Sequence, residues 1–244
     1  MGLVMSKNIE VLSDKNALIA RALQLILSRM KTAIQQRGLF TIALSGGSTP
    51  KPLYEVIAQQ QLPWDKIHVF WGDERYVPPH HPDSNQLMAR NVWLSKVGIP
   101  EENIHSMPTN DSEPRIAAAK YEQHLQDFFR STSENFPALD IVLLGMGDDA
   151  HTASLFPQTE ALSVDNRLIT VGHKDGNMRL TFTYPFINAA RCVMFIVGGV
   201  NKRSALAKVF APEADNYQYP SRLIKPQGEL WWLLDEAAGS ELTS

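Results

Sequence analysis

The sequence predicts an α/β fold of the doubly wound type, with a mostly parallel sheet and helices on both of its faces. Segments with the apolar run of a strand alternate along the chain with segments of helical periodicity, which is typical of a parallel sheet. Several of these strands are apolar throughout, as expected where helices cover both faces. No Gly/Ser linker divides the 244 residues, so we expect a single domain over residues 1–244.

The first long helix can be capped by Ser13 or Asp14 and ends at Gly38. Its predicted stripe recurs at helical spacing and consists of Leu18, Ala22, Leu25, Arg29 and Ala33. Apolar runs then predict strands at residues 39–44, 66–71, 139–146, 167–172, 178–184, 192–199 and 228–235. Helices are expected at 52–60, 85–94, 114–130 and 201–210. The prolines and the Asp-Ser-Asn cluster of residues 72–85 predict a loop without regular structure.

Four of the apolar strands end in a glycine turn: "ALSGG", "VFWGDER", "VLLGMGDDAH" and "FIVGGVNK". In an open parallel sheet the carboxyl ends of the strands lie along one edge, where the ligand crevice forms. The polar residues that follow these four strands are therefore expected to converge on one site.

The turn "SGGSTP" after the first of these strands has the features of an anion site. Gly46 and Gly47 let backbone N–H groups approach an anion, Ser48 and Thr49 supply hydroxyls, and the helix after Pro50 adds its positive end. The spacing matches neither G-x-G-x-x-G nor the nucleotide P-loop, so the turn suits a single phosphate monoester. The alternative is an ordinary strand-to-helix turn in which Ser48 or Thr49 caps the helix.

Two cations are candidates to accompany the phosphate. Arg179 starts an apolar strand, and Lys202 directly precedes a helix. Arginine can bind phosphate through two parallel hydrogen bonds. The alternative for each residue is a solvated surface charge.

The segment "GMGDDAHTASLFP" carries the candidate catalytic residues. His151 follows a buried strand by a few residues, and Asp149 is near enough to fix its tautomer and stabilise the imidazolium, as a general base requires. The chain has no H-E-x-x-H motif and no G-x-S-x-G elbow. We therefore expect neither a metal site nor serine-esterase chemistry, and no cofactor.

The segment "WGDERYVPPHHPDSN" adds further candidates. Arg75 is placed to polarise a substrate oxygen, and Asp73 and Asn85 are candidates to bind the substrate, with Asn85 on sugar hydroxyls. The alternative is a charged surface turn.

The composition argues against two classes of partner. The formal net charge of −3 lacks the basic surplus of a nucleic-acid-binding protein. No run of about 18 apolar residues is present to span a membrane, and the N-terminus lacks the pattern of a secretory signal. We expect a cytoplasmic protein that is a monomer or a weak homodimer and acts on a small molecule.

Five motifs in order resemble those of the 6-phosphogluconolactonases, a family that shares a fold with the glucosamine-6-phosphate deaminases. They are "SGGSTP", "WGDERYV" with "DSN" after it, "GMGDDAHTASLFP", "MRLTFTYPFINAA" and "GGVNKRSAL", and the resemblance extends over residues 39–235. It implies hydrolysis of 6-phosphoglucono-δ-lactone to 6-phosphogluconate, the second step of the oxidative pentose phosphate pathway. It also implies that the Ser48/Thr49 loop, Arg179 and Lys202 hold the sugar phosphate, and that His151 is the base.

The sequence departs from the family pattern at one position. The family usually has glycine between the aspartate and the histidine, where this chain has Ala150. Glycine adopts φ > 0 at no steric cost, whereas alanine there costs roughly 1 kcal/mol or more. Either the backbone is right-handed at Ala150 or the loop is strained or shifted, which bears on the orientation of His151.

Two other functions stay open. A glucosamine-6-phosphate deaminase resembles this chain in fold, but its chemistry depends on a carboxylate five residues beyond the histidine, where this chain has Phe156. A non-catalytic sugar-phosphate sensor is the second alternative. The presence of Asp149 beside His151 argues against it, since binding alone needs no base.

Overall fold

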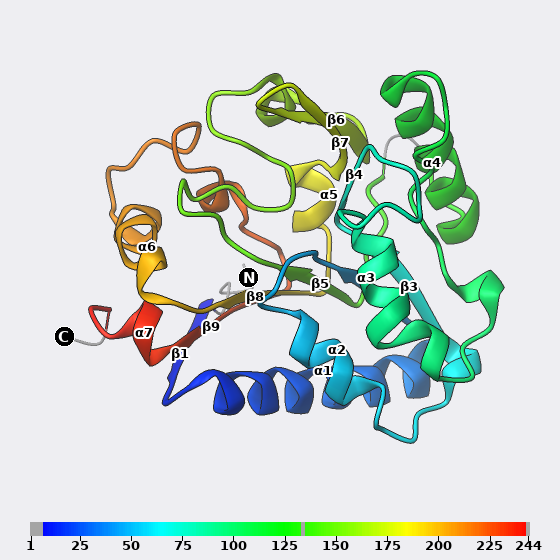
Figure 1. Cartoon of the computed structure of the whole chain (residues 1–244), viewed down its shortest axis with the longest axis horizontal. Helices are drawn as coiled ribbons and strands as arrows, with labels where there is room; N and C mark the ends of the chain where they lie inside the picture. The colour runs from blue at the N-terminus through cyan, green and yellow to red at the C-terminus, as the bar shows by residue number, and fades with distance from the viewer. Residues whose placement is uncertain (1–6, 133–134, 243–244) are drawn as a thin grey trace, which may run out of the picture.

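The computed structural model describes residues 7–132 and 135–242, and its centre is a six-stranded sheet in which every pairing is parallel (Figure 1). The strands, in spatial order, are β1 (Lys7–Leu12), β9 (Glu229–Asp235), β8 (Cys192–Val197), β5 (Ile141–Leu144), β2 (Phe40–Leu44) and β3 (Ile67–Trp71). The edge strand β1 was not expected from the sequence, because none of its six residues is buried and the segment lacks the apolar run of the central strands.

Helices flank this sheet on both faces. They are α1 (Lys15–Arg37), α2 (Lys51–Ile57), α3 (Asn85–Val92), α4 (Pro114–Phe129), α5 (Tyr184–Asn188), α6 (Arg203–Phe210) and α7 (Glu236–Gly239). In the view of Figure 1, α1 and α2 lie below the sheet, and α5 and α6 lie above it. The predicted doubly wound α/β class is confirmed.

A second, three-stranded antiparallel sheet lies over the main one, on the side of α5 (Figure 1). Its strands, in spatial order, are β4 (Asp73–Arg75), β7 (Asn177–Phe182) and β6 (Ile169–Lys174). The expectation that residues 72–85 form no regular structure is therefore wrong at Asp73–Arg75. These three residues become a strand only because β7, more than a hundred residues later, supplies their hydrogen-bond partners.

The helix α1 shows how the predicted local signals operate. Of the two candidate caps, Asp14 is the one used, and its side chain accepts a hydrogen bond of 2.8 Å from the backbone N–H of Ala17. Gly38 closes the helix in the left-handed conformation with φ of 81°. The polar member of the predicted stripe, Arg29, forms an ion pair with Glu229 on β9.

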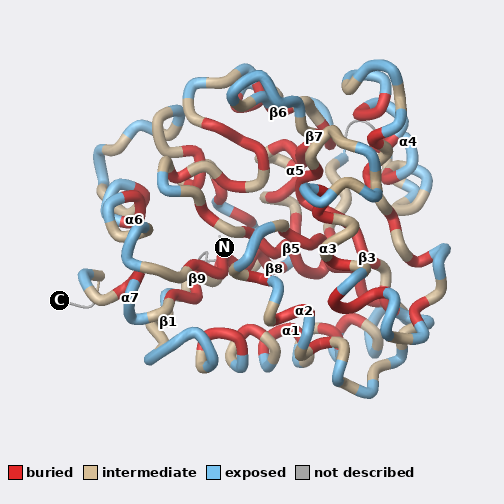
Figure 2. The backbone as a smooth tube through the Cα atoms, in the orientation of Figure 1, coloured by how far each residue is buried: buried red, intermediate tan, exposed pale blue. Residues whose placement is uncertain are grey.

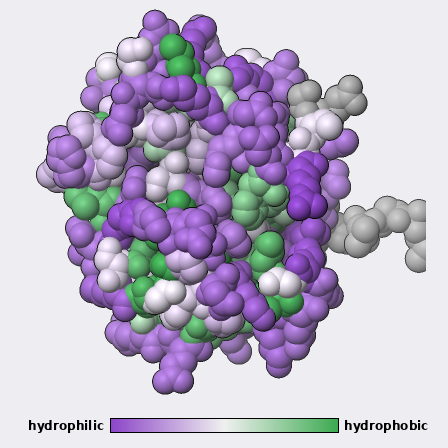
Figure 3. All heavy atoms as spheres, turned by 90° about the vertical axis from the view of Figure 1, so that its right-hand side faces the viewer, coloured by the Kyte–Doolittle hydropathy of each residue, from purple (hydrophilic) through white to green (hydrophobic). Residues whose placement is uncertain are grey.

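The core lies between the layers. Figure 2 shows the buried backbone along the central strands and on the inner side of α1. All residues of β2, β5 and β8 are buried, which agrees with strands covered on both faces. On the face shown in Figure 3, hydrophilic side chains dominate and hydrophobic ones lie in small groups. Within the described residues, no helix has the length and apolar character needed to cross a bilayer.

Candidate active site

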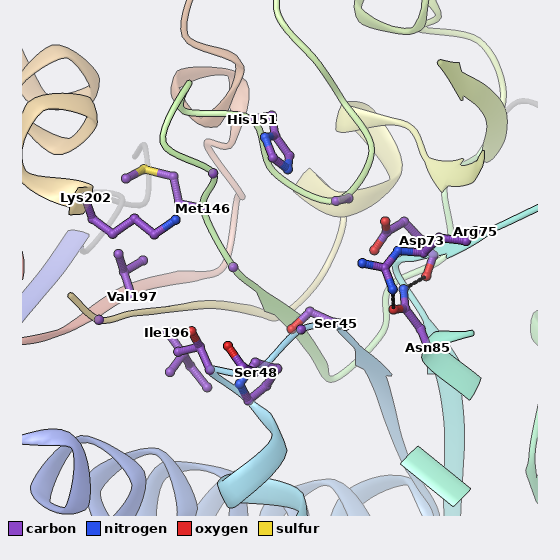
Figure 4. Close-up of a pocket in the computed structure, with 18 of the residues that line it drawn as sticks. Ser45, Ser48, Asp73, Arg75, Asn85, Met146, His151, Ile196, Val197 and Lys202 are labelled. Carbon is purple, nitrogen blue, oxygen red and sulfur yellow. Dashed lines mark hydrogen bonds between the residues drawn. The ribbon is translucent and has the colours of Figure 1, made fainter. Parts of the chain in front are cut away.

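The carboxyl ends of β2, β3, β5 and β8 surround one cavity of about 290 Å³. From β2 the chain proceeds to β3 on one side and later returns to β5 on the other side, so the strand order reverses at β2. Such a reversal is where open α/β sheets form their ligand crevice. Figure 4 shows His151 across the cavity from Ser48, with Lys202 on one flank and Asp73, Arg75 and Asn85 on the other.

The structure brings ten of the eleven residues singled out from the sequence to this cavity. They are Gly46, Gly47, Ser48, Thr49, Asp73, Arg75, Asn85, His151, Arg179 and Lys202. Asp149 is the exception, because it contacts His151 rather than lining the cavity. The convergence expected from the four glycine turns is thus present, while the roles of the individual side chains stay predictions.

The turn after β2 is fixed at its base by the buried Tyr54 on α2. The hydroxyl of Tyr54 accepts a hydrogen bond from the N–H of Ser45 (3.0 Å) and donates one to its carbonyl (2.7 Å). Gly46 has to be glycine, because a Cβ atom there would lie 1.8 Å from Oδ1 of Asn85. The residue that caps α2 is Pro50, with no side-chain hydrogen bond. The alternative that Ser48 or Thr49 caps the helix is therefore wrong, and both residues line the cavity.

His151 and Asp149 form a hydrogen-bonded dyad on the loop after β5. Oδ1 of Asp149 lies 2.5 Å from Nδ1 of His151 and also accepts a 3.1 Å bond from the His151 backbone N–H. Burial raises the pKa of Asp149, but the hydrogen bonds and charge of His151 and the charge of Lys174 outweigh this, and the net pKa is lowered. An ionised carboxylate only accepts hydrogen bonds, so Nδ1 carries the proton and the neutral imidazole presents an unprotonated Nε2.

Two small residues make this dyad possible. A Cβ atom on Gly147 would lie 2.0 Å from Nδ1 of His151, so only glycine leaves room for the ring. Ala150 has a φ of 63° and is fully buried. Its carbonyl accepts hydrogen bonds from the N–H and the hydroxyl of Ser221, at 2.9 and 2.7 Å. The backbone of Ala150 is therefore left-handed and strained, as one of the two sequence-based expectations had it. The hydrogen bonds from Ser221 hold it in this conformation.

Two arginines lie opposite each other beside the cavity. Arg75 on β4 is the cross-strand partner of Arg179 on β7. Nη1 of Arg75 donates to the carbonyl of Asp83 (2.7 Å) and to Oδ1 of Asn85 (2.8 Å). Within the described residues, the Nε–H groups of both guanidiniums are buried without a partner. Burial lowers the pKa of Arg179, against the charge of Asp73, which raises it. The two unpaired Nε–H groups can donate to an anion bound in the cavity.

Asp73 and Asn85 complete this side of the cavity. Oδ2 of Asp73 accepts a 2.6 Å hydrogen bond from the hydroxyl of Ser154, and Nδ2 of Asn85 donates to the carbonyl of Asp73 at 2.9 Å. Glu74, whose role the sequence did not reveal, is buried and accepts hydrogen bonds from the N–H groups of Asn85 and Gln86, at 2.8 and 2.7 Å. It anchors the start of α3 and thereby Asn85. Burial raises the pKa of Glu74 against these hydrogen bonds.

Lys202 reaches the cavity from the turn after β8, but it already has a partner. Its Nζ lies 2.5 Å from Oδ1 of Asp148, which also accepts a 2.8 Å bond from Asn201. These hydrogen bonds lower the pKa of Asp148. Asp148 was not predicted as a site residue, although it directly precedes Asp149. A substrate phosphate would share Lys202 with this carboxylate.

No cluster of three or more His, Cys, Asp and Glu side chains suited to hold a metal ion occurs in the part of the chain that the structure describes.

Comparison with known proteins identifies the family. The sequence model of the family described as glucosamine-6-phosphate isomerases/6-phosphogluconolactonase matches residues 13–232. The chain belongs to this family. The match begins earlier than the motif-based resemblance, which starts at residue 39, because it also takes in the whole of α1.

Two highly similar relatives carry the name of the lactonase side of the family. The chain is 72% identical to the 6-phosphogluconolactonase of Nostoc sp., over 98% of this chain and 100% of the relative. It is 60% identical to that of Synechocystis sp., over 98% and 99% respectively. The solved structure of 6-phosphogluconolactonase from Trypanosoma cruzi superposes with a TM-score of 0.87 at 27% identity, covering 100% of this chain and 99% of that one. The resemblance to 6-phosphogluconolactonases is confirmed.

Proposed function

We propose that this protein hydrolyses 6-phospho-D-glucono-1,5-lactone to 6-phospho-D-gluconate, the lactonase step of the oxidative pentose phosphate pathway. The names of the 72% and 60% identical relatives support this. The observation that carries the proposal is that the Asp149–His151 dyad opens onto the same cavity as two arginines, Lys202 and the Ser-Gly-Gly-Ser-Thr turn.

The phosphate binds first, in this proposal, at the turn of Gly46 to Thr49. Backbone N–H groups and the hydroxyls of Ser48 and Thr49 coordinate its oxygens, and Arg179 and Lys202 compensate its charge. Support comes from the position of all these groups on the cavity and from the unpaired buried Nε–H of Arg179. Asp73 and Asn85 bind hydroxyls of the sugar. Tethering at the phosphate holds the lactone carbonyl near His151, which converts the attack of water into an intramolecular-like step.

His151 acts as the general base. Its unprotonated Nε2 removes a proton from water as the water oxygen attacks the lactone carbonyl carbon, and Asp149 stabilises the imidazolium that forms. Arg75 and backbone N–H groups stabilise the oxyanion of the tetrahedral intermediate. The bond from the carbonyl carbon to the ring oxygen then breaks, and His151 returns its proton to that oxygen. Loss of the new acid proton to solvent leaves 6-phosphogluconate.

The proposal includes neither a metal nor another cofactor, because a lactone carbonyl is already activated toward water. Dialysis against a chelator is expected to leave the hydrolysis rate unchanged. Loss of activity on chelation, with recovery after a divalent cation is added, would contradict this part of the proposal and leave the substrate assignment intact.

Phe156 argues against deaminase chemistry at this site. It occupies the position where the deaminase motif has a carboxylate, and its ring lies 4.5 Å from that of His151. A phenyl ring cannot relay a proton. Release of ammonia from glucosamine 6-phosphate by the purified protein would reverse this conclusion. Tight binding of sugar phosphates without hydrolysis would favour the sensor.

The test is hydrolysis of freshly generated 6-phosphogluconolactone at controlled pH, with spontaneous opening subtracted. We expect wild-type turnover well above background. His151→Ala should lose roughly 10²- to 10⁴-fold in kcat, the usual contribution of a general base. His80→Ala, which removes an exposed histidine from the loop after β4, is the matched control and should retain full activity. Turnover by His151→Ala at the wild-type rate would rule out the assignment.

We also propose that the protein acts in the cytoplasm, as a monomer or weak homodimer, on this small molecule without nucleic-acid or membrane partners. Sedimentation velocity over a range of protein concentrations tests the oligomeric state, and a stable higher oligomer would contradict it.

A further inference from the structure

A lysine from the small antiparallel sheet contacts the back of the catalytic dyad. Lys174 is the last residue of β6, and its Nζ lies 3.4 Å from Oδ2 of Asp149. The other oxygen of that carboxylate, Oδ1, bonds to Nδ1 of His151. Asp149 thus bridges an ammonium group and an imidazole, one on each oxygen. Lys174 does not line the cavity, so it acts on the reaction through the groups that it contacts, and Asp149 is the one to which it bonds.

The hairpin and an aromatic ring position Lys174. It pairs with Asn177 across the β6–β7 hairpin, whose turn residues Asp175 and Gly176 have φ of 51° and 81°, as a tight two-residue turn requires. Its ammonium lies 5.0 Å from the centre of the Phe156 ring, a cation–π distance. The side chain is 39% exposed, so its charge is partly shielded from solvent.

The charged groups around His151 come from several elements. Asp149 shares its loop, Lys174 approaches from β6, and Arg179 on β7 lies 5.3 Å from the centre of the same Phe156 ring. Arg75 and Asp73 face the cavity from β4, and Lys202, paired with Asp148, faces it from the turn after β8. Of these groups only Asp149 bonds to the imidazole, and Lys174 is the cation bonded to Asp149.

We propose that Lys174 is a positioning residue for the lactonase reaction. Its ammonium bonds to Oδ2 of Asp149 while Oδ1 bonds to the imidazole, and its charge offsets that of the carboxylate so that the imidazole stays able to accept a proton. An aspartate without this counter-charge stabilises the imidazolium more strongly, which would keep the base protonated at mildly acidic pH. This inference rests on the proposed function, because it assigns a task to His151 as base.

The first experiment compares Lys174→Met, Lys174→Arg and wild type in pH profiles of kcat/KM from pH 5 to 8. Loss of the positive charge should move the acid limb of Lys174→Met to higher pH by roughly half a unit to one unit, the size expected for a partly shielded charge. Its kcat/KM should fall about three- to tenfold at the acid end and match wild type at pH 8. Lys174→Arg keeps the charge and should restore the wild-type profile. Lys31→Met, on the exposed side of α1, controls for loss of one lysine charge.

The second experiment needs no turnover. NMR of the labelled histidine rings, with the His151 signals assigned from their loss in His151→Asn, follows protonation of that imidazole in the free protein. Lys174→Met should move the protonation midpoint upward by the same amount as the acid limb. An unchanged midpoint, or a loss of activity equal at every pH, would overturn the proposal. If the wild-type protein has no lactonase activity but Lys174→Met still shifts the protonation midpoint of His151, the proposed function is wrong. The electrostatic linkage of Lys174 to His151 through Asp149 is then still supported.

Discussion

Arg75 and Arg179 lie directly opposite each other in the antiparallel pairing of β4 with β7, and both guanidiniums line the candidate active site. Like charges at directly opposite positions destabilise an antiparallel pair. The charges of Asp73, Glu74 and Asp83 offset part of this repulsion, but the buried Nε–H groups of both arginines lack a partner among the described residues. A dianionic phosphate would supply acceptors for them. We infer that this pairing lowers the stability of the protein without ligand and raises its affinity for an anionic substrate.

Arg179→Met should therefore weaken substrate binding and leave the fold intact. Hydrogen bonds to a charged group contribute about 1.5–3 kcal/mol, so we expect KM for 6-phosphogluconolactone to rise about 10- to 150-fold. Steady-state kinetics measure this, with unphosphorylated gluconolactone as the control substrate, whose hydrolysis should change little. In thermal unfolding, inorganic phosphate should raise the Tm of wild type more than that of the variant. Equal losses on both lactones would show that Arg179 does not bind the phosphate.

Asp148→Asn should improve binding of the substrate. Asp148 holds the ammonium of Lys202, so it competes with the substrate phosphate for that cation. Its side chain is 64% exposed, and solvent screens the interaction, so we expect only about a two- to fivefold decrease in KM, which should vanish at high salt. Glu213→Gln, an exposed carboxylate elsewhere, controls for net charge. A higher KM in Asp148→Asn would mean that Asp148 positions Lys202 instead of competing for it.

Ala150→Gly should change stability by less than about 1 kcal/mol. Relief of the left-handed backbone favours glycine by about 1–2 kcal/mol. The loss of a buried methyl group, about 0.8 kcal/mol, and the greater freedom of glycine in the unfolded chain, about 0.4–1 kcal/mol, oppose it. Ala150→Val adds a β-branched side chain at φ of 63° in a fully buried position, and should cost more than about 2 kcal/mol. Urea unfolding measures both variants. A tenfold gain in kcat for Ala150→Gly would show that the strain misplaces His151.

His105 should make the protein sensitive to acid. It is buried between Phe70 and Phe128 and bonds to His68 and His124, at 3.1 and 2.8 Å. Burial, together with the charges of His124 and His68, lowers the pKa of His105 to about 3. A histidine in the unfolded chain has a pKa of about 6.5. As the pH is lowered, the unfolded state therefore binds this proton at a higher pH than the folded state does. Above pH ~6.5 this proton therefore does not affect the free energy of unfolding. Below that pH the free energy of unfolding decreases as the pH falls toward 3.

His105→Gln tests this, because glutamine keeps a hydrogen-bonding side chain and does not titrate. Between pH 6.5 and 5, one proton accounts for a loss of up to about 2 kcal/mol in the free energy of unfolding of wild type. The variant should lose correspondingly less. Urea unfolding at pH 7, 6 and 5 gives the two slopes, and parallel slopes would contradict the prediction whatever the absolute stability of the variant.

Local signals in the sequence predicted much of this protein. Asp14 and Gly38 mark the ends of α1 through capping chemistry that depends on neighbouring residues alone. The apolar runs of β2, β5 and β8 reveal strands because burial on both faces leaves no polar position. The small antiparallel sheet was harder to predict from the sequence, although the Asp175–Gly176 pair between two strands is a recognised hairpin signal.

Pairings between distant segments could not be predicted from such local signals. The strand at Asp73–Arg75 exists because β7 pairs with it, and nothing within residues 72–85 encodes that partner. The contact of Lys174 with Asp149 joins residues 25 positions apart through a hairpin and a loop. The competition of Asp148 for Lys202 likewise joins residues 54 positions apart.

The sequence by itself determined the order of the central strands and the long helices, the four glycine turns at the ends of parallel strands, and hence the edge of the sheet where the site would form. These features follow from periodicity, capping and steric freedom, which act over a few residues. Only the tertiary structure decided which charges pair within the site, that Ala150 is left-handed, and that Arg75 faces Arg179. Charge pairing and backbone strain depend on distances between segments that fold together, and those distances follow from the packing of the whole chain.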